Sequence, residues 1–296
     1  MPPRSWKERS VPRIANFFNQ SPPAAYKELE LRKLFNRHRK SWQLPDSLTN
    51  KKLLNFLVDS TLLTAIEIES QKYESQETVR YCWGDVSPFA VANSLRPSSF
   101  LAYSSAAYVN GLIDEIPKTF YVNKEQSEKP PNTGGLQQAS IDRAFSGKQR
   151  KSEMVLSWSG YQAVIINGKN SGNLGVVTQE LDDGSKVHVT NLERTLVDMA
   201  VRPGYSGGVH KVLEAYERAR NNLKTVRLAT YLKKLDYTYP YHQCIGFYLE
   251  KAGYPENALA RFLDQEIAFD FYLDYGIKSP DFVKRWRLYV PKGFGF

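Results

Sequence analysis

The sequence has little of what metal-binding and disulfide-linked proteins need. It contains two cysteines, Cys82 and Cys244, which lie far apart along the chain. Two such residues form no disulfide framework, and a zinc site would need further ligands close by. The four histidines are scattered, and none has a second histidine or a cysteine three or four residues further on. We therefore expect no metal and no cofactor, and two buried, reduced thiols.

Long hydrophobic runs are also missing. No apolar stretch approaches the roughly 18–20 residues that span a bilayer. The basic start MPPRSWKERSVPR is not followed by the apolar region of a signal peptide. The composition, 42% hydrophobic and 13% aromatic, excludes a disordered chain. We expect a folded cytoplasmic protein with no membrane partner.

What the sequence does have is an uneven distribution of positive charge. The formal net charge is +9, and residues 1–55 carry 12 Lys/Arg against 4 Asp/Glu, a net of +8. Residues 56–85 carry 2 against 6, a net of −4. A concentrated basic segment is typical of proteins that bind a polyanion such as DNA. A solvated basic surface without a partner is the alternative.

The first 85 residues predict three helices. Apolar residues recur at helical spacing in Val11–Gln20, in Leu31–His38 and in Leu53–Val58. Ser21-Pro22-Pro23 would end the first helix, because proline cannot continue one. The hydroxyl of Thr49 is suited to cap the third.

A β-hairpin is predicted to follow these helices. Ile66 and Ile68 alternate with acidic residues, and a second alternating run covers Val79–Trp83. Three helices and a hairpin, in this order, are typical of a winged helix-turn-helix. We predict an α+β protein in which residues 1–85 form a winged helix-turn-helix DNA-binding domain. A larger mixed α/β domain would cover residues 86–296.

The third predicted helix has two opposed faces. Its leucines gather on one arc, and Lys51, Lys52 and Asn55 gather on the other. Recognition helices commonly contact bases through their first turns, and an amide can pair with adenine. We therefore expect these three side chains in the major groove. The other predicted DNA-binding side chains, at the end of the second helix and at the tip of the hairpin, are expected against phosphate or the minor groove. The predicted DNA-binding residues are Arg37, Arg39, Lys40, Lys51, Lys52, Asn55, Lys72 and Tyr73.

Strand and helix patterns are mixed in residues 86–296. A helix is expected to begin near Thr190, which with Glu193 fits a capping box. On this helix Arg194 and Asp198 lie one turn apart and predict a structural ion pair. Four helical patterns follow up to Phe262, and AFDFYLD predicts a last strand. The earlier strands are expected at Lys118–Val122, Tyr161–Asn167, Leu174–Glu180 and Lys186–Thr190.

Short motifs in this part favour turns over catalytic sites. Asp182-Asp183-Gly184 is typical of a hairpin turn, and neither Asp270/Asp274 nor Glu250-Lys251 has the spacing of a metal-dependent nuclease. We therefore predict that the protein is not an enzyme. Two alternatives stay open. One is a nuclease targeted by the N-terminal domain, and the other is a ligand-sensing regulator that binds an anion at Gly204–Gly208.

Several segments together resemble the AbiEi family of antitoxins, which belong to type IV toxin–antitoxin systems of abortive phage infection. They cover most of the chain in the order of the family. The N-terminal ELRKLFNRHRKSWQLP is also similar to its winged-helix domain. Ala102–Ser105 departs from the family, in which a Ser-His pair is common here. The other matching segments are RYCWGDVSPFAVANSLRPSSFLAYSSAAYVNGLIDEIPKTFYVN, LQQASIDRAFSGKQR, VTNLERTLVDMAVRPGYSGGVHKVLEAY, KKLDYTYPYHQCIGFYLEKAGY and WRLYVPKGF.

The resemblance implies an antitoxin with two functions. The N-terminal domain would bind inverted repeats in its own operator and repress the operon. The C-terminal domain would neutralise a cognate nucleotidyltransferase toxin without forming a stable complex. The expected partners are therefore double-stranded operator DNA and this toxin. We expect a monomer in solution that binds DNA cooperatively.

Overall fold

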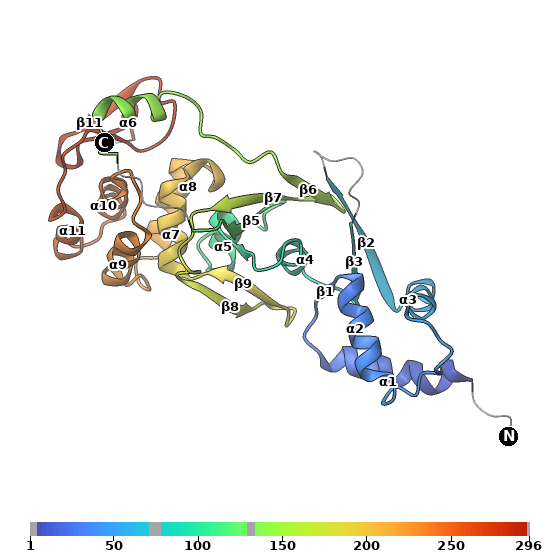
Figure 1. Ribbon diagram of the computed structural model, residues 1–296. Coiled ribbons are helices and arrows are strands. Elements are labelled where there is room, and N and C mark those ends of the chain that lie inside the picture. Colours follow the sequence, from blue (N-terminus) through green and yellow to red (C-terminus); the bar gives the residue numbers. More distant parts are fainter. Residues whose placement is uncertain (1–4, 71–77, 129–133, 295–296) are drawn as a thin grey trace.

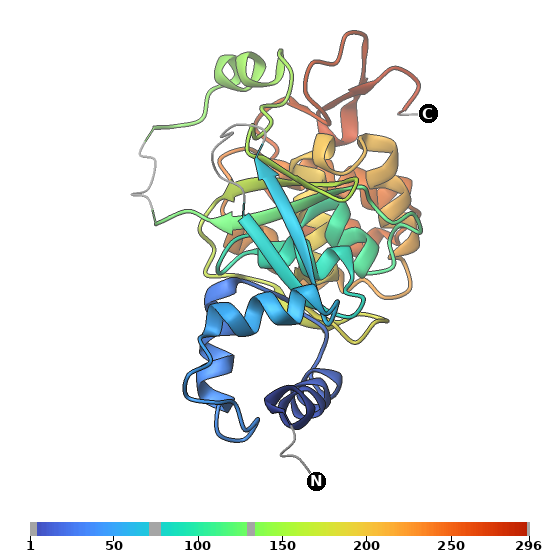
Figure 2. The same cartoon turned by 90° about the vertical axis from the view of Figure 1, so that its right-hand side faces the viewer.

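A curved sheet of nine strands runs through the middle of the protein, between two groups of helices (Figure 1). The computed structural model describes residues 5–70, 78–128 and 134–294. Helices α1 to α3 lie at one end of the molecule, and α6 and the last strands lie at the other (Figure 2). The fold is therefore mixed α/β, as predicted. No helix in these ranges is long and apolar enough to cross a membrane.

The three predicted helices and the two hairpin strands occur in the predicted order, and an unpredicted two-residue strand lies between the first two helices and pairs with the second hairpin strand. Their bounds are α1 (Trp6–Gln20), β1 (Ala25–Tyr26), α2 (Glu28–His38), α3 (Asn50–Asp59), β2 (Leu63–Ser70) and β3 (Thr78–Trp83). Helix α1 begins five residues before the predicted Val11, because Ser5 and Glu8 form a capping box there. It ends before Ser21, as expected. Thr49 caps α3, since its hydroxyl accepts a hydrogen bond from the Lys52 amide at 3.2 Å.

The three helices share one hydrophobic core. Leu31 and Phe35 of α2 and the leucines of α3 are buried, so the predicted apolar faces are confirmed. Trp42 lies in the turn between α2 and α3 and is 3% exposed. Its ring stacks on His38 with centroids 5.0 Å apart. This core is formed by Ile14, Phe18, Leu31, Phe35, Trp42, Leu44, Leu53, Leu54, Leu57 and Leu63.

The second part contains the predicted strands and additional short ones. The four predicted strands, α7 and the four helices after it are confirmed, whereas α4, α5, α6, β4, β6, β11 and β12 were not predicted. The AFDFYLD segment contains the two-residue strand β10, but it is not the last strand, because β11 and β12 follow it. Cys244 in α10 and Cys82 in β3 are buried free thiols. The bounds are α4 (Pro88–Ser94), β4 (Phe100–Leu101), α5 (Tyr103–Val109), β5 (Thr119–Glu125), α6 (Gln138–Phe145), β6 (Val155–Trp158), β7 (Tyr161–Gly168), β8 (Val176–Glu180), β9 (Lys186–Thr190), α7 (Leu192–Val201), α8 (Val209–Arg218), α9 (Thr225–Leu235), α10 (Tyr241–Lys251), α11 (Glu256–Leu263), β10 (Phe271–Tyr272), β11 (Pro280–Val283) and β12 (Leu288–Pro291).

The capping box predicted at Thr190 and Glu193 is wrong. Asn191 caps α7, and its side chain accepts a hydrogen bond from the Arg194 amide at 3.1 Å. The Thr190 hydroxyl instead lies 2.8 Å from the hydroxyl of Thr195 inside the protein. Glu193 accepts from the Lys224 amide, at the start of α9. These tertiary contacts move the cap by one residue.

The large sheet contains strands from both sides of residue 85, where a domain boundary is predicted. Its strand order is β1-β3-β2-β6-β7-β5-β4-β9-β8. Among the described residues, β2 pairs with β6 of the second part at Glu69 with Ser157 and at Ser70 with Leu156. Buried Arg80 in β3 also donates hydrogen bonds to Ser94 at the end of α4. The boundary itself stays a prediction.

A glycine sets the packing distance between α10 and the C-terminal segment. A Cβ atom on Gly246 would lie 2.1 and 2.2 Å from ring atoms of Trp286. Trp286 is fully buried in the core formed by α7–α11 and the small sheet of β10–β12. The indole therefore fits only against a residue without a side chain.

We predict that Gly246→Ala destabilises the protein. At an exposed position inside a helix, replacing glycine by alanine stabilises the protein by roughly 1 kcal/mol. Here overpacking should instead cost about 1–3 kcal/mol. Chemical denaturation of both proteins measures the difference. Gly147→Ala is the control, because no atom lies within 4 Å of the added Cβ at that position. Equal stability of the two variants would contradict the packing described here.

Candidate functional site

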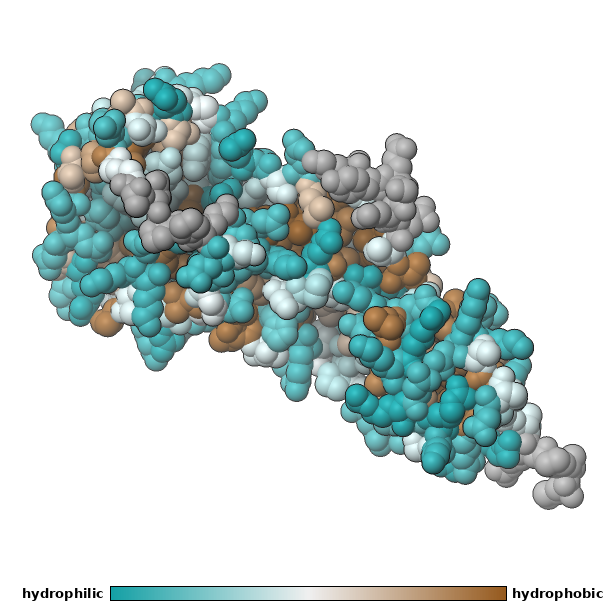
Figure 3. Space-filling model, in the orientation of Figure 1, coloured by the Kyte–Doolittle hydropathy of each residue, from teal (hydrophilic) through white to brown (hydrophobic). Residues whose placement is uncertain are grey.

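Helix α3 presents the predicted polar face to solvent. Lys51, Lys52 and Asn55 are exposed, whereas Leu53, Leu54 and Leu57 on the opposite face are buried. The helix lies on the outer side of the N-terminal part, away from α7–α11 (Figure 1). On the face seen in Figure 3 the surface over the N-terminal helices is mainly hydrophilic.

The first turn of α3 has a charge that helix stability does not explain. The N-terminus of a helix carries a partial positive charge and favours acidic side chains. The first turns of α1 and α2 follow this rule with Glu8, Glu28 and Glu30. The first turn of α3 has no acid and contains Lys51 and Lys52 instead. Two cations and the helix dipole therefore form one positive end that is open to solvent.

Arg37, Lys40 and Arg39 lie at the end of α2 but in different environments. Arg37 and Lys40 are exposed. The half-buried Arg39 donates hydrogen bonds to the carbonyl oxygens of Pro45 at 2.7 Å and Leu48 at 2.9 Å. It also donates to Oδ1 of Asn50 at 3.2 Å. Arg39 therefore holds the turn between α2 and α3, a role that the sequence analysis did not foresee.

Two predicted contact residues cannot be placed. Lys72 and Tyr73 were expected at the tip of the hairpin, and they lie outside the described residues. The strands on either side, β2 and β3, are antiparallel as predicted, and their pairing extends from Leu63 opposite Trp83 to Ile68 opposite Thr78. The hairpin is thus confirmed in its strands only.

We predict that Arg39→Ala destabilises the N-terminal part. Several carbonyl and amide groups of the turn would lose a charged donor, which costs about 1–3 kcal/mol. Arg37→Ala is the matched control, because it removes the same side chain from an exposed site and should change stability by less than about 0.5 kcal/mol. Thermal and urea unfolding of both variants provide the comparison. Equal losses would show that Arg39 does not hold the turn.

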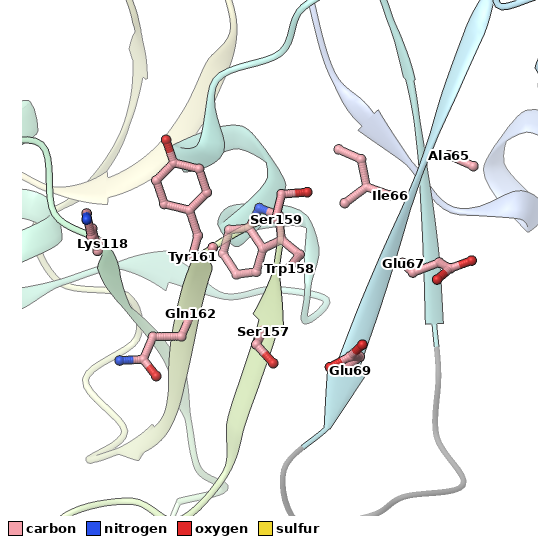
Figure 4. A pocket seen from close by; sticks show the side chains of 11 residues that line it. Ala65, Ile66, Glu67, Glu69, Lys118, Ser157, Trp158, Ser159, Tyr161 and Gln162 are labelled. Carbon is pink, nitrogen blue, oxygen red and sulfur yellow. The ribbon is translucent and has the colours of Figure 1, made fainter.

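An open groove of about 690 Å³ separates β2 from β6 and β7 beyond their two paired residues. Ile66 lies on the β2 side of the groove, and Trp158 and Tyr161 lie on the other (Figure 4). Glu67 and Glu69 also line it from β2. Lys118 lies across from these two carboxylates, so the groove is only weakly acidic. None of the predicted DNA-binding residues that the structure describes lines it.

The buried ion pair predicted on α7 is confirmed. Nε of Arg194 lies 2.8 Å from Oδ1 of Asp198, and both side chains are at most 5% exposed. Burial alone would lower the pKa of Arg194, but the Asp198 carboxylate together with Tyr237 and Tyr103 raises it above its ordinary value. Nη1 of Arg194 also donates to the Leu174 carbonyl at 2.8 Å and to the Ser171 hydroxyl at 3.0 Å. The pair is therefore structural, as expected.

A second carboxylate, Glu125, continues this network. It accepts hydrogen bonds from the hydroxyl and amide of Ser171 and from the Asn173 amide. Partial burial would raise the pKa of Glu125, but these hydrogen bonds and the charge of Arg194 bring it below its ordinary value. Glu125 thus stays ionised and fixes the connection between β7 and β8.

A small pocket of about 270 Å³ lies beside the Arg194–Asp198 pair. It is formed where the parallel strands β5 and β7 end, against α7 and the segment that joins α9 to α10. The residues of this pocket come from widely separated segments and form no motif, so no pattern along the sequence indicates it. Its polar lining includes Asn123, Lys169, Arg194, Asp198, Arg202 and Tyr237.

The other motifs weighed in the sequence have structural explanations. Asp183 accepts hydrogen bonds from the amides of Ser185 and Ser87, as part of the turn between β8 and β9. In the loop Gly204–Gly208, Tyr205 is buried and packs on Tyr103 with centroids 5.2 Å apart. Within the described residues, no three His, Cys, Asp or Glu side chains are grouped to hold a metal ion. The nuclease alternative therefore gains no support from a described acidic cluster.

The comparisons with known proteins establish only the fold. No protein-family model matches the chain, and no curated protein matches it. The structure is similar to the crystal structure of the RV2827C protein from Mycobacterium tuberculosis, with a TM-score of 0.58 and 13% sequence identity. The similarity covers 97% of this chain and 92% of that one. At this identity it shows a shared arrangement of elements along nearly the whole chain.

Proposed function

We propose that the protein is a DNA-binding antitoxin of the AbiEi family that represses its own operon. Residues 1–85 would act as a winged helix-turn-helix, with α2 and α3 as the helix pair and β2–β3 as the wing. The observation that carries the DNA-binding part is the pair of exposed lysines in the first turn of α3. Packing and the helix dipole give no reason for them, whereas a phosphate or a base edge does.

The same surface supports a division of labour among the predicted residues. Asn55 lies one turn after Lys51 and Lys52 on the exposed face, so its amide is the candidate for adenine. Arg37 and Lys40 at the end of α2 would contact phosphate, together with Lys72. Arg39 would act on DNA binding mainly by holding the turn that orients α3. Thr49 adds to this orientation by fixing the first turn of α3.

We predict that Lys51→Ala/Lys52→Ala weakens binding to the upstream operator. If each lysine contacts one phosphate, the slope of log K against log salt should become less steep by about 2. Gel shifts at several salt concentrations measure this. Lys233→Ala/Lys234→Ala is the matched control, because it removes an exposed lysine pair from α9. Unchanged affinity of the α3 variant would refute the assignment of α3 as the recognition helix.

Asn55→Ala separates base contacts from phosphate contacts in the same assay. Loss of a bidentate adenine contact should cost about 1–3 kcal/mol on the operator and little on an unrelated duplex. An equal loss on both duplexes would assign Asn55 to the backbone of the DNA instead.

The toxin-directed part of the proposal rests on the sequence resemblance. We infer that residues 86–296 counteract a nucleotidyltransferase toxin encoded by a neighbouring gene, without a stable complex. A neighbouring nucleotidyltransferase gene is the first observation to seek. The protein itself would act through binding, as a regulator and antitoxin, and not as an enzyme.

We predict that antitoxicity and DNA binding can be separated. When the neighbouring toxin gene is induced, co-expression of the wild-type protein should restore growth. The Lys51→Ala/Lys52→Ala variant should restore growth equally but should no longer repress an operator–reporter fusion. Immunoblots confirm equal amounts of the two proteins. Failure of the wild-type protein to restore growth would rule out the antitoxin function.

A further inference from the structure

The pocket beside α7 contains a buried polar atom without a partner. Asn123 is only 4% exposed, and its Oδ1 has no hydrogen-bond partner among the residues that the structure describes. A buried acceptor of this kind costs free energy unless something binds to it. The Asn123 amide fits here only because residue 168 is a glycine, since a Cβ on Gly168 would lie 2.5 Å from Oδ1 of Asn123. The glycine at the end of β7 therefore makes room for the amide.

Two cations of the same pocket lack a close carboxylate partner. Within the described residues no carboxylate oxygen lies closer than 4.0 Å to Arg202 or Lys169. Arg202 is half-buried at the end of α7, and it donates a hydrogen bond of 3.5 Å to the Arg150 carbonyl. Lys169 lies at the rim and is 47% exposed; its Nζ donates a hydrogen bond to the Asp236 carbonyl, and the Asp236 carboxylate is 4.0 Å away. Arg194, in contrast, is already paired with Asp198.

The place of the pocket in the fold also points to a ligand. In open α/β sheets, ligands bind outside the carboxyl ends of parallel strands. Here β5 (Thr119–Glu125) and β7 (Tyr161–Gly168) are parallel, and the pocket lies at their carboxyl ends. Tyr103, which lines it from α5, is held in a left-handed backbone conformation with φ of 54°. Such outliers cluster at functional sites.

We propose that this pocket binds a small organic phosphate that carries hydroxyl groups, of the size of a pentose phosphate or a mononucleotide. Arg202 and Lys169 would bind the phosphate, because Arg and Lys are the usual partners of that group. The free Oδ1 of Asn123 would accept a hydrogen bond from a ligand hydroxyl. The volume of about 270 Å³ leaves no room for a nucleic-acid strand. This inference does not depend on the proposed DNA-binding and antitoxin functions.

Thermal unfolding with defined probes tests the ligand class. Ribose 5-phosphate and AMP are compared with ribose, inorganic phosphate and gluconate at equal concentration and ionic strength. At least one of the two organic phosphates should raise the unfolding midpoint by about 2–4 °C. Ribose, inorganic phosphate and gluconate should have smaller effects. Equal shifts with inorganic phosphate would overturn the proposal, as would equal shifts with gluconate or no shift with either organic phosphate.

Variants of the full-length chain then test the site. Arg202→Gln should abolish the shift, and Lys169→Gln, at an exposed rim position, tests the same site with less risk to folding. Asn123→Ala should weaken binding about threefold to tenfold, because one hydrogen bond is lost. Arg261→Gln, on the exposed face of α11, is the control with the same change of charge. The proposal fails if Lys169→Gln and Arg202→Gln both respond like the wild type, or if Arg261→Gln loses the response equally.

Discussion

A charge buried in a protein has to be paired there, and this constraint organises the second part of the molecule. Arg194 satisfies its guanidinium through Asp198, Ser171 and the Leu174 carbonyl. Ser171 in turn binds Glu125 at the end of β5. One cation thus connects α7 to β5 and to the segment between β7 and β8. Removing either charge of the pair would leave the other unpaired in the interior, which is more costly than replacing both.

The N-terminal part uses its charges in the opposite way. Its cations surround a small leucine and aromatic core, and the lysines that begin α3 are exposed. Arg39 and the buried Arg80 differ from these, and the donors of Arg39 close the turn that sets the angle between α2 and α3. The proposed DNA-binding surface therefore depends on Arg39, which fixes the turn that orients α3. The cations proposed to contact DNA are free to do so because another has taken the structural role.

Local patterns predicted the helices well, and contacts between distant segments decided the rest. The core face of α2 follows from the helical spacing of Leu31 and Phe35, and that of α3 from the spacing of Leu53 and Leu57. This spacing can be seen without knowing which element each helix packs against. Strands β4 and β12 are two and four residues long, so they lack enough residues to show a pattern. Their pairing comes from segments elsewhere in the chain.

The same distinction explains which site residues could be found. Lys51, Lys52 and Asn55 lie on one turn of one helix, so a helical wheel identifies them. Arg39 has the same chemistry as its neighbours in the sequence, and only the carbonyl groups of the folded turn distinguish it. Asn123 and Arg202 come together from β5 and α7, which no spacing along the chain indicates. The cap of α7 was misplaced for a similar reason, because Thr190 bonds Thr195 inside the protein.

The short contact between β2 and β6 has a consequence for solubility. In the described part of β2, only Glu69 and Ser70 pair with β6, so the edge from Leu63 to Ile68 has no partner strand on that side. Open strand edges invite another chain to add a strand, which leads to aggregation. Glu67 and Glu69 place negative charge on this strand and line the groove beside it. An incoming strand would have to bury or approach these carboxylates, which disfavours strand addition at the joint between the two parts.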